Sequence, residues 1–303
     1  MKIEDFPLLF EPCRCELSPE AQTFIEMEGE LTKENIEAFN KGRIEFLADW
    51  HEHASIGNVE RKMFTYQNGD YTGEGLVYRP SDRPDEILPV VIYYHGGAWI
   101  TLCKECYEYE CAAIAEQVGC VVFNMDYRCA PFHKFPIPVQ DCYAAFQAVK
   151  EKAADYGADA GRIALAGDSA GGNLALAVAL MARDKKERIN YLALAYPGVG
   201  IDPEVDEFAM YYLKSPEEAD DPLVSPIMDE HPEKLPPLSI VIGTCDFLLD
   251  QNLRYMRKVQ SAGAEAELLL YQGMPHGFIQ MTTPPGKDSV RMMAEKIKEH
   301  LYQ

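Results

Sequence analysis

The chain has 303 residues, of which 47% are hydrophobic, and its formal net charge at pH 7 is −21. This composition can bury a large core, and it excludes a chain that is disordered along most of its length. Because no basic stripe is present to neutralise phosphates, the charge argues against a nucleic-acid partner and against an anionic membrane surface. Neutral small molecules are the partners that the charge favours.

No targeting or membrane segment is expected. The N-terminal sequence MKIEDFPLLFEPCRCEL lacks a basic region followed by an apolar run, which a signal peptide needs. No stretch reaches the ~18 uncharged apolar residues of a membrane span. Nine scattered cysteines suit reduced thiols in the cytoplasm better than a disulfide framework. The oligomeric state stays open, with a homodimer as one option.

Residues 1–55 are predicted to form a helical segment that is separable from the rest of the chain. Ser18-Pro19-Glu20 is a helix-start signal, with Ser as N-cap and Pro at the first helical position. From Ile36 onward the apolar residues follow a loose helical stripe: Phe39, Phe46, Leu47 and Trp50.

Residues 56–303 are predicted to be one α/β domain. Short apolar strands are expected at Gly75–Arg79, Pro89–Tyr94, Val121–Met125, Arg162–Ala166, Tyr191–Tyr196, Leu238–Gly243 and Glu267–Tyr271. Helices are expected at Val139–Tyr156, Gly171–Arg183 and Leu248–Ala262, with a last one from about Ser289. This alternation predicts a mostly parallel sheet with helices on both faces. A stretch rich in Pro, Asp and Glu at about 198–237 interrupts the alternation and is expected to be a cap insertion.

Three cysteines, Cys103, Cys106 and Cys111, lie in a C-x-x-C-x-x-x-x-C cluster that resembles part of a metal site. A fourth ligand at a recognisable spacing is missing. We therefore favour ordinary buried or surface thiols, and we expect neither a metal nor a cofactor.

The most informative motif is Gly167-Asp168-Ser169-Ala170-Gly171, which matches G-x-S-x-G. A short apolar strand precedes it and an Ala/Leu-rich helix follows, which is the setting of a nucleophile elbow. In that turn the serine hydroxyl stands above the sheet, and the flanking glycines avoid collisions with the neighbouring strand and helix. The motif predicts Ser169 as a nucleophile.

A second glycine motif, His95-Gly96-Gly97-Ala98-Trp99, directly follows the predicted strand Pro89–Tyr94. By itself it could be a turn. Combined with the elbow, it predicts an oxyanion hole made by the backbone N–H groups of Gly96, Gly97 and Ala170. We expect His95 to hold this loop by hydrogen bonds.

Asp246 and His276 supply the remaining catalytic groups of the hypothesis. Asp246 follows the predicted strand Leu238–Gly243, and His276 lies in a loop after Glu267–Tyr271. The order Ser, Asp, His, with both partners at strand ends, is typical of a Ser-His-Asp triad on an α/β-hydrolase sheet. Asp250 is a second acid after the same strand, and we expect it to be a first-turn helix acid.

These motifs resemble the hormone-sensitive-lipase family of α/β-hydrolases, carboxylesterases that carry H-G-G-G and G-D-S-A-G-G. The resemblance begins at about Leu88 and includes Asp126-Tyr127-Arg128-Cys129-Ala130-Pro131 and Asp221-Pro222-Leu223-Val224-Ser225-Pro226. It implies an α/β-hydrolase sheet, a cap built from the N-terminal helices and the insertion, no cofactor, and cleavage of small neutral esters with short acyl chains.

The chain departs from the family pattern at three points. Ala98 replaces the third glycine of H-G-G-G, Phe132 stands where an acidic residue is usual, and the spacing from Ser169 to Asp246 is short, which suggests a trimmed cap. Two alternatives stay open: an amidase or deacetylase on the same triad, and a non-catalytic small-molecule receptor of the same fold.

Overall fold

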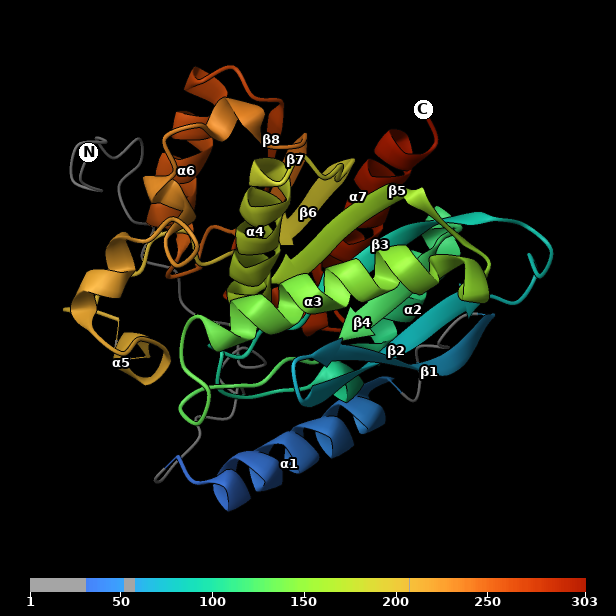
Figure 1. The fold of residues 1–303 in the computed structure, drawn as a ribbon, viewed down its shortest axis with the longest axis horizontal. Coiled ribbons are helices and arrows are strands. Elements are labelled where there is room, and N and C mark those ends of the chain that lie inside the picture. The colour runs from blue at the N-terminus through green and yellow to red at the C-terminus, as the bar shows by residue number, and fades with distance from the viewer. Residues whose placement is uncertain (1–30, 52–57, 207) are drawn as a thin grey trace.

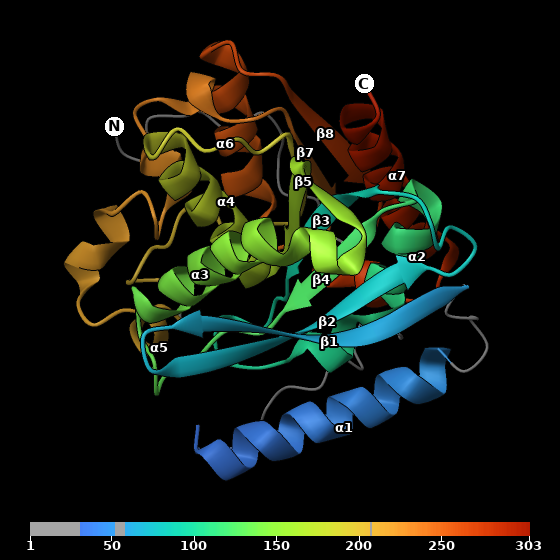
Figure 2. The ribbon, with the colours of Figure 1, turned by 45° about the vertical axis from the view of Figure 1, so that its right-hand side comes forward.

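The computed structural model describes residues 31–51, 58–206 and 208–303. Ser18, Pro19 and Glu20, which were expected to start a helix, lie outside these residues. The first described helix is α1 (Lys33–His51), which lies below the edge of the β1–β2 ribbon and apart from the other helices in two views (Figures 1 and 2). It agrees with the helical stripe expected from Ile36.

One eight-stranded sheet forms the centre of the molecule, in the order β1-β2-β4-β3-β5-β6-β7-β8. β2 runs antiparallel to both of its neighbours, and every pairing from β4 to β8 is parallel. The strands are β1 (Val59–Asn68), β2 (Tyr71–Pro80), β3 (Leu88–Tyr94), β4 (Val121–Met125), β5 (Ala158–Asp168), β6 (Tyr191–Ala195), β7 (Leu238–Gly243) and β8 (Ala266–Tyr271).

Helices cover both faces of this sheet, as the alternating pattern predicts. α3 (Ile137–Lys152) and α4 (Ser169–Asp184) lie in front of the sheet in Figure 1, and α2 (Glu108–Val118) and α7 (Pro284–Leu301) lie behind it. α6 (Leu249–Ser261) connects β7 to β8. The inner strands β3, β4, β6 and β7 are buried along their whole length, because helices cover them from both sides.

Most of the predicted elements are confirmed, two of them to the residue (β4 and β7). α7 begins at Pro284 and not near Ser289, because the Thr283 hydroxyl caps the helix through the amide of Gly286 and prolines occupy its first turn. Three strands or α-helices of the described chain, namely β1, α2 and α5 (Ala209–Tyr212), are not predicted by the sequence pattern. β1 is an edge strand with mostly exposed side chains, so it lacks a continuous apolar signal.

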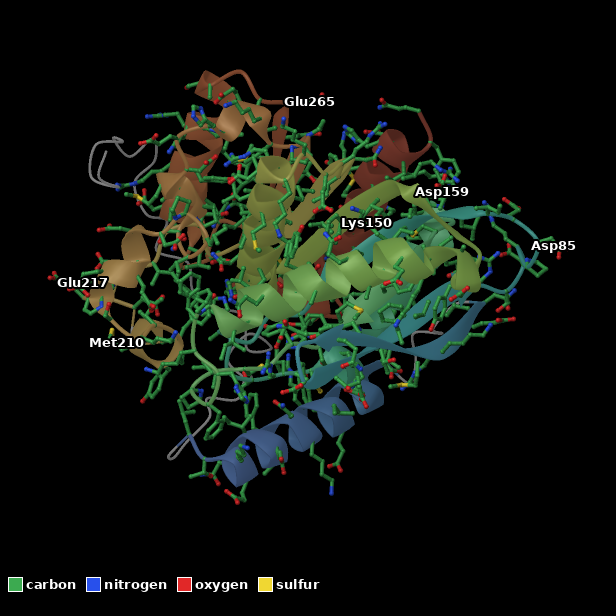
Figure 3. The ribbon with its side chains drawn as sticks, in the orientation of Figure 1. Asp85, Lys150, Asp159, Met210, Glu217 and Glu265 are labelled. Carbon is green, nitrogen blue, oxygen red and sulfur yellow. The ribbon has the colours of Figure 1, made fainter. Side chains whose placement is uncertain are left out.

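The insertion after β6 contains one short helix, α5 (Ala209–Tyr212), and three 3₁₀ turns at Pro216–Asp220, Pro226–Met228 and Pro232–Lys234. Its outer surface bears Met210 and Glu217, which project away from the body of the molecule (Figure 3). Its inner side is anchored to the sheet domain, since the Asn173 amide donates to the carbonyl oxygens of Gly198 and Val224. In the described part of the chain, no helix is long and apolar enough to cross a membrane.

The expectation of reduced thiols holds for six cysteines: Cys103, Cys106, Cys111, Cys120, Cys129 and Cys142. It is wrong for Cys245, which is disulfide-bonded. An odd number of cysteines scattered along the chain argues against a disulfide framework, but it is compatible with a single disulfide bond. Among the described residues, no group of three His, Cys, Asp or Glu side chains could hold a metal ion.

Candidate active site

The nucleophile elbow has the geometry that its glycines predict. Ser169 has a φ of 50°, at the junction of β5 and α4. A Cβ on Gly171 would lie 2.0 Å from the carbonyl oxygen of Tyr94 in β3, and a Cβ on Gly167 would lie 2.6 Å from the carbonyl carbon of Gly171. Glycine at both positions is therefore a steric requirement for this close strand–helix approach.

The structure brings Ser169, His276 and Asp246 together in one hydrogen-bonded chain. His276 Nε2 lies 2.9 Å from Ser169 Oγ, and His276 Nδ1 lies 2.9 and 3.0 Å from the two carboxylate oxygens of Asp246. Asp246 is buried, and its Oδ1 also accepts the amide of Leu248 at 2.8 Å. This arrangement can pass a proton from the hydroxyl to the imidazole and hold the imidazole in one orientation.

Asp250, the other acid after β7, takes no part in this chain. Its carboxylate pairs with Arg254 one turn along α6, at 2.7 Å. The sheet decides between the two acids, because Asp246 leaves β7 next to β8, whose following loop carries His276, whereas Asp250 is already in the helix.

The imidazole of His276 lies between two aromatic rings. Tyr196 is buried with its ring centroid 4.5 Å from that of His276, and Phe247 lies at the same distance on the exposed side. Phe247 is 76% exposed, so it covers the imidazole without being covered itself. Both rings restrict the histidine orientation by packing.

The loop 95–102 adopts a strained conformation above the elbow. Gly97, Ala98 and Trp99 have φ values of 110°, 53° and 63°, in the region that side chains rarely occupy. A Cβ on Gly97 would lie 2.1 Å from the carbonyl oxygen of Thr101. No acceptor among the described residues is found for the amides of Gly97 and Ala98, so these N–H groups are available to a ligand.

The Gly96 amide, predicted as an oxyanion donor, points elsewhere. It donates to Asp168 Oδ1 at 2.9 Å and lies 3.2 Å from the Tyr107 hydroxyl oxygen. This donor is occupied by the protein itself, because the buried Asp168 carboxylate lies directly beneath it. Gly96 is therefore not an available donor, whereas the neighbouring amides of Gly97 and Ala98 are.

Asp168 lies within the G-x-S-x-G motif, but the sequence does not predict the contacts of its side chain. Its carboxylate accepts hydrogen bonds from Tyr93, Tyr107 and the Gly96 amide, at 3.0, 2.9 and 2.9 Å. Burial raises the pKa of Asp168 to about 6, although these donors act in the opposite direction. Tyr107 carries no signal in the sequence, since only the fold places its hydroxyl beneath the elbow.

His95 supports the same loop, as expected. Its Nδ1 lies 2.8 Å from the carbonyl oxygen of Gly96, and its own carbonyl accepts the Tyr127 hydroxyl at 2.8 Å. The ring is buried and stacks on Tyr127 with 4.3 Å between centroids. Burial lowers the pKa of His95, which favours the neutral imidazole of a structural residue.

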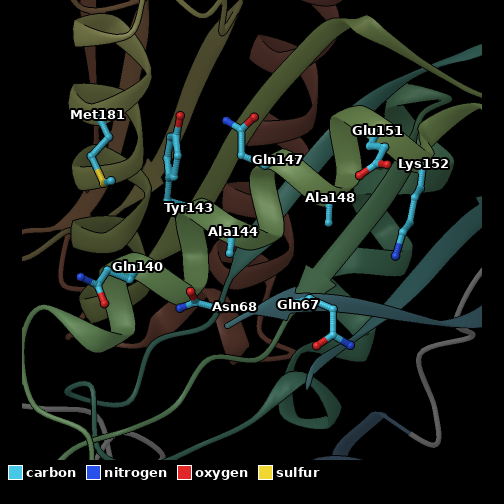
Figure 4. Close-up of a pocket in the computed structure, with 10 residues that line it drawn as sticks. All are labelled: Gln67, Asn68, Gln140, Tyr143, Ala144, Gln147, Ala148, Glu151, Lys152 and Met181. Atoms are coloured by element: carbon cyan, nitrogen blue, oxygen red, sulfur yellow. The ribbon is translucent and has the colours of Figure 1, made fainter. Parts of the chain in front are cut away.

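A hollow of about 470 Å³ lies elsewhere, over α3, and is lined by Gln67, Asn68, Gln140, Tyr143, Gln147 and Lys152 among others (Figure 4). None of the residues that line it belongs to the Ser169–His276–Asp246 chain or to the loop 95–102. It is an open depression on the outer face of α3, away from the Ser169–His276–Asp246 chain, so it is not a substrate site for this chemistry.

Comparison with known proteins agrees with the fold. A family model described as "alpha/beta hydrolase fold" matches residues 91–280. An arylesterase of Saccharolobus solfataricus is 29% identical over 289 residues, which cover 87% of this chain and 92% of that protein. The carboxylic ester hydrolase LipN of Mycobacterium tuberculosis is 32% identical over 228 residues, and the match spans 67% of this chain but 60% of that longer protein.

Solved structures extend the similarity to nearly the whole fold. A hyperthermophilic esterase from the archaeon Pyrobaculum calidifontis superposes with a TM-score of 0.84 and 30% identity, covering 93% of this chain and 98% of that one. A thermophilic carboxylesterase cloned from a metagenomic library also has a TM-score of 0.84, with 29% identity. The chain belongs to the hormone-sensitive-lipase-like family of α/β-hydrolases.

Proposed function

We propose that this protein is a serine carboxylesterase that cleaves short-chain acyl esters through an acyl-enzyme. The coarser statement, that it is a carboxylic ester hydrolase, follows from the family and from the esterases that it resembles over most of its length. The finer proposal rests on one observation, the hydrogen-bonded chain from Ser169 Oγ through His276 to Asp246.

In the first half-reaction, the Ser169 oxygen attacks the ester carbonyl while His276 Nε2 takes the hydroxyl proton. Asp246 keeps the Nδ1–H of His276 in place and stabilises the imidazolium that forms. His276 then returns the proton to the leaving alcohol, and the acyl group stays on Ser169. In the second half, water takes the place of the hydroxyl, and the same proton transfers release the acid.

The developing oxyanion is proposed to bind the amides of Gly97, Ala98 and Ala170. The first two have no acceptor among the described residues, and Ala170 lies in the first turn of α4, where amides have no partner within the helix. Each such donor supplies about 3 kcal/mol of transition-state stabilisation. Gly96 is left out of this set, because it supports the loop through Asp168.

The preference for short acyl chains is inferred from the cap. The described part of the insertion holds a single four-residue α-helix and short turns, so it offers little apolar length beside Ser169. Each methylene that a longer chain buried would contribute ~0.8 kcal/mol, but only where apolar surface is available to receive it. An ethyl acetate hydrolase of Pseudomonas putida, 28% identical over 247 residues, is among the relatives.

Replacing Ser169 with Ala tests the nucleophile. We expect a folded variant with ester turnover reduced by a factor on the order of 10⁴ or more, measured with p-nitrophenyl acetate. A burst of p-nitrophenol from the unmodified protein would separate an enzyme from a receptor. Activity retained in the variant, once contamination is excluded, would contradict the assignment of Ser169.

A panel of p-nitrophenyl esters tests the substrate class. We expect higher kcat/KM for acyl chains of about two to six carbons than for longer ones, measured below their aggregation threshold. Anilides with the same acyl groups should be turned over much more slowly. A preference for the anilides would indicate an amidase, and a preference for long chains would contradict the inference from the cap.

A further inference from the structure

We propose that Cys103 and Cys106 form a redox-active dithiol that a small disulfide compound converts to an internal disulfide, and that this oxidation lowers esterase activity through the loop 95–102. The proposal rests on two independent features of the described chain. One is the geometry of the sulfur pair, and the other is the position of Tyr107, which directly follows Cys106.

The two sulfur atoms are already close to bonding distance. Cys103 Sγ and Cys106 Sγ lie 3.8 Å apart and share a hydrogen bond in which either atom can be the donor. The Cys106 amide donates to the Cys103 carbonyl at 3.0 Å, so one tight turn joins the two residues. A disulfide requires about 2.05 Å between the sulfurs, which a small change in the two side chains and this turn would provide.

The pair combines a partly exposed cysteine with a close cysteine partner, which no other free cysteine among the described residues does. Cys103 is partly exposed, whereas Cys106 is 1% exposed and lies directly behind it. Cys111, Cys120 and Cys142 are buried with no close cysteine partner at sulfur–sulfur bonding distance among the described residues. An external reagent therefore reaches Cys103 first, and only Cys106 is placed to resolve the product.

The exchange balances with a low-molecular-weight disulfide such as oxidised glutathione as the oxidant. Cys103 Sγ attacks one sulfur of the reagent while its proton passes to Cys106 Sγ. The S–S bond of the reagent breaks, and one glutathione thiolate leaves and takes that proton from Cys106. The Cys106 thiolate then attacks Cys103 Sγ and displaces the second glutathione thiolate. The two cysteines lose two electrons and two protons, and the reagent is reduced to two thiols.

The thiolate that this reaction needs is favoured at the pair. The hydrogen bond from the Cys103 thiol lowers the pKa of the Cys106 thiol, and the nearby Arg43 guanidinium acts in the same direction. The same hydrogen bond raises the pKa of the Cys103 thiol, so Cys103 attacks as its proton passes to Cys106 Sγ across that bond.

The pair lies between two anchors of the loop 95–102. On one side, Leu102 precedes Cys103 and donates its amide to Asn40 of α1 at 2.7 Å. On the other side, the Tyr107 hydroxyl donates to Asp168 and lies 3.2 Å from the Gly96 nitrogen. A disulfide that tightens the turn 103–106 would move Leu102, Tyr107 or both, and with them the amides of Gly97 and Ala98.

The experiment exposes the full-length protein to oxidised glutathione and follows both the linkage and kcat on p-nitrophenyl acetate. After free thiols are alkylated, peptide mapping should find Cys103 joined to Cys106, with two hydrogens lost. We expect kcat to fall about tenfold. This is less than the loss of a whole oxyanion donor would cost, because the disulfide would displace the donors without removing them. Dithiothreitol should restore it.

Two variants serve as matched controls. Cys103→Ser should keep the activity of the reduced protein and lose its response to oxidised glutathione, whereas Cys129→Ser, which removes another partly exposed thiol, should respond as the unmodified protein does. Taking Cys103→Ser through the same cycle of oxidation and reduction also accounts for the disulfide of Cys245. If Cys103→Ser does not fold, Cys106→Ala replaces it.

Absence of the Cys103–Cys106 linkage, or equal inactivation of the unmodified protein and Cys103→Ser, would overturn the proposal. So would formation of the linkage with unchanged kcat. The activity measurement rests on the proposed esterase function, but the mapping of the linkage does not. The two ideas can therefore fail separately: a protein without esterase activity could still form the disulfide.

Discussion

Two loops adjoin Ser169, and they are held in place by different kinds of contact. The loop 95–102 is fixed from below by buried polar side chains, chiefly Asp168 and Tyr107. The loop that carries His276 is fixed by close backbone approach. There the Cys245 amide donates to the Met274 carbonyl, and a Cβ on Gly243 would lie 1.9 Å from that same carbonyl oxygen.

Because their supports differ, the two loops should respond to different changes. A loop supported by buried ionisable groups depends on pH and on the exact hydroxyls around it, because an uncompensated buried charge is costly. A loop supported by backbone packing depends on side-chain volume instead. The four predictions below test this contrast, in order of decreasing effect.

The largest effect is expected at Asp246, the proposed acid of the triad. Asp246→Asn should lower kcat by about 10⁴, because the amide would leave His276 in the wrong tautomer, and it should change the melting temperature little, since Asn can still accept the Leu248 amide. Steady-state kinetics and thermal unfolding of the same preparation test this. A variant with nearly full activity would remove Asp246 from the mechanism.

The second prediction concerns Glu110 of α2, a buried carboxyl whose charge would be repelled by that of Asp168. Neither of its oxygens accepts a hydrogen bond from another described residue, and burial raises its pKa to about 8. Between about pH 5 and pH 8 the folded protein holds a proton that the unfolded chain has lost. The free energy of unfolding should therefore fall as pH rises, by about 1.4 kcal/mol per pH unit.

Glu110→Gln should lack this contribution. The difference in unfolding free energy between the two proteins, from urea titrations at several pH values, should change steadily over that interval in favour of the variant. Parallel pH dependences of the two proteins would show that Glu110 is already ionised in the folded state.

A smaller effect is expected at the hydroxyl beneath the loop 95–102. Tyr107→Phe should lower kcat about tenfold, since the Tyr107 hydroxyl contacts both Asp168 and the Gly96 amide and so positions the neighbouring donors. Tyr93→Phe is the matched control, because Asp168 is the one hydrogen-bond partner of the Tyr93 hydroxyl among the described residues. Its effect on kcat should be clearly weaker. Equal losses in the two variants would indicate that the charge of Asp168, and not the position of Gly96, is what matters.

The smallest effect is expected at Asp250. Its contact is a helix-surface pair with Arg254, so Asp250→Asn should cost no more than about 1 kcal/mol of stability and leave kcat unchanged. Thermal unfolding and kinetics test this alongside Asp246→Asn. A large loss of activity in Asp250→Asn would mean that the acid of the triad had been misassigned.

Much of the fold follows from the sequence alone. Val121–Met125 and Leu238–Gly243 are uniformly apolar because helices cover their strands on both faces, and this local signal fixes their bounds. The elbow is equally local, since both glycines and the serine lie within five consecutive residues of the chain, Gly167 to Gly171. Edge strand β1 escapes detection because an exposed face carries no such pattern.

The sequence also selects Ser169, Asp246 and His276, because each follows a strand at the same edge of a parallel sheet. Which amides of the loop 95–102 are available to a ligand was decided only by the tertiary structure. Gly96 and Gly97 are alike in sequence, but the buried carboxylate of Asp168 engages the first and leaves the second available. The same holds for Tyr107, whose hydroxyl donates to Asp168 in a distant segment of the chain, a contact that no local pattern records.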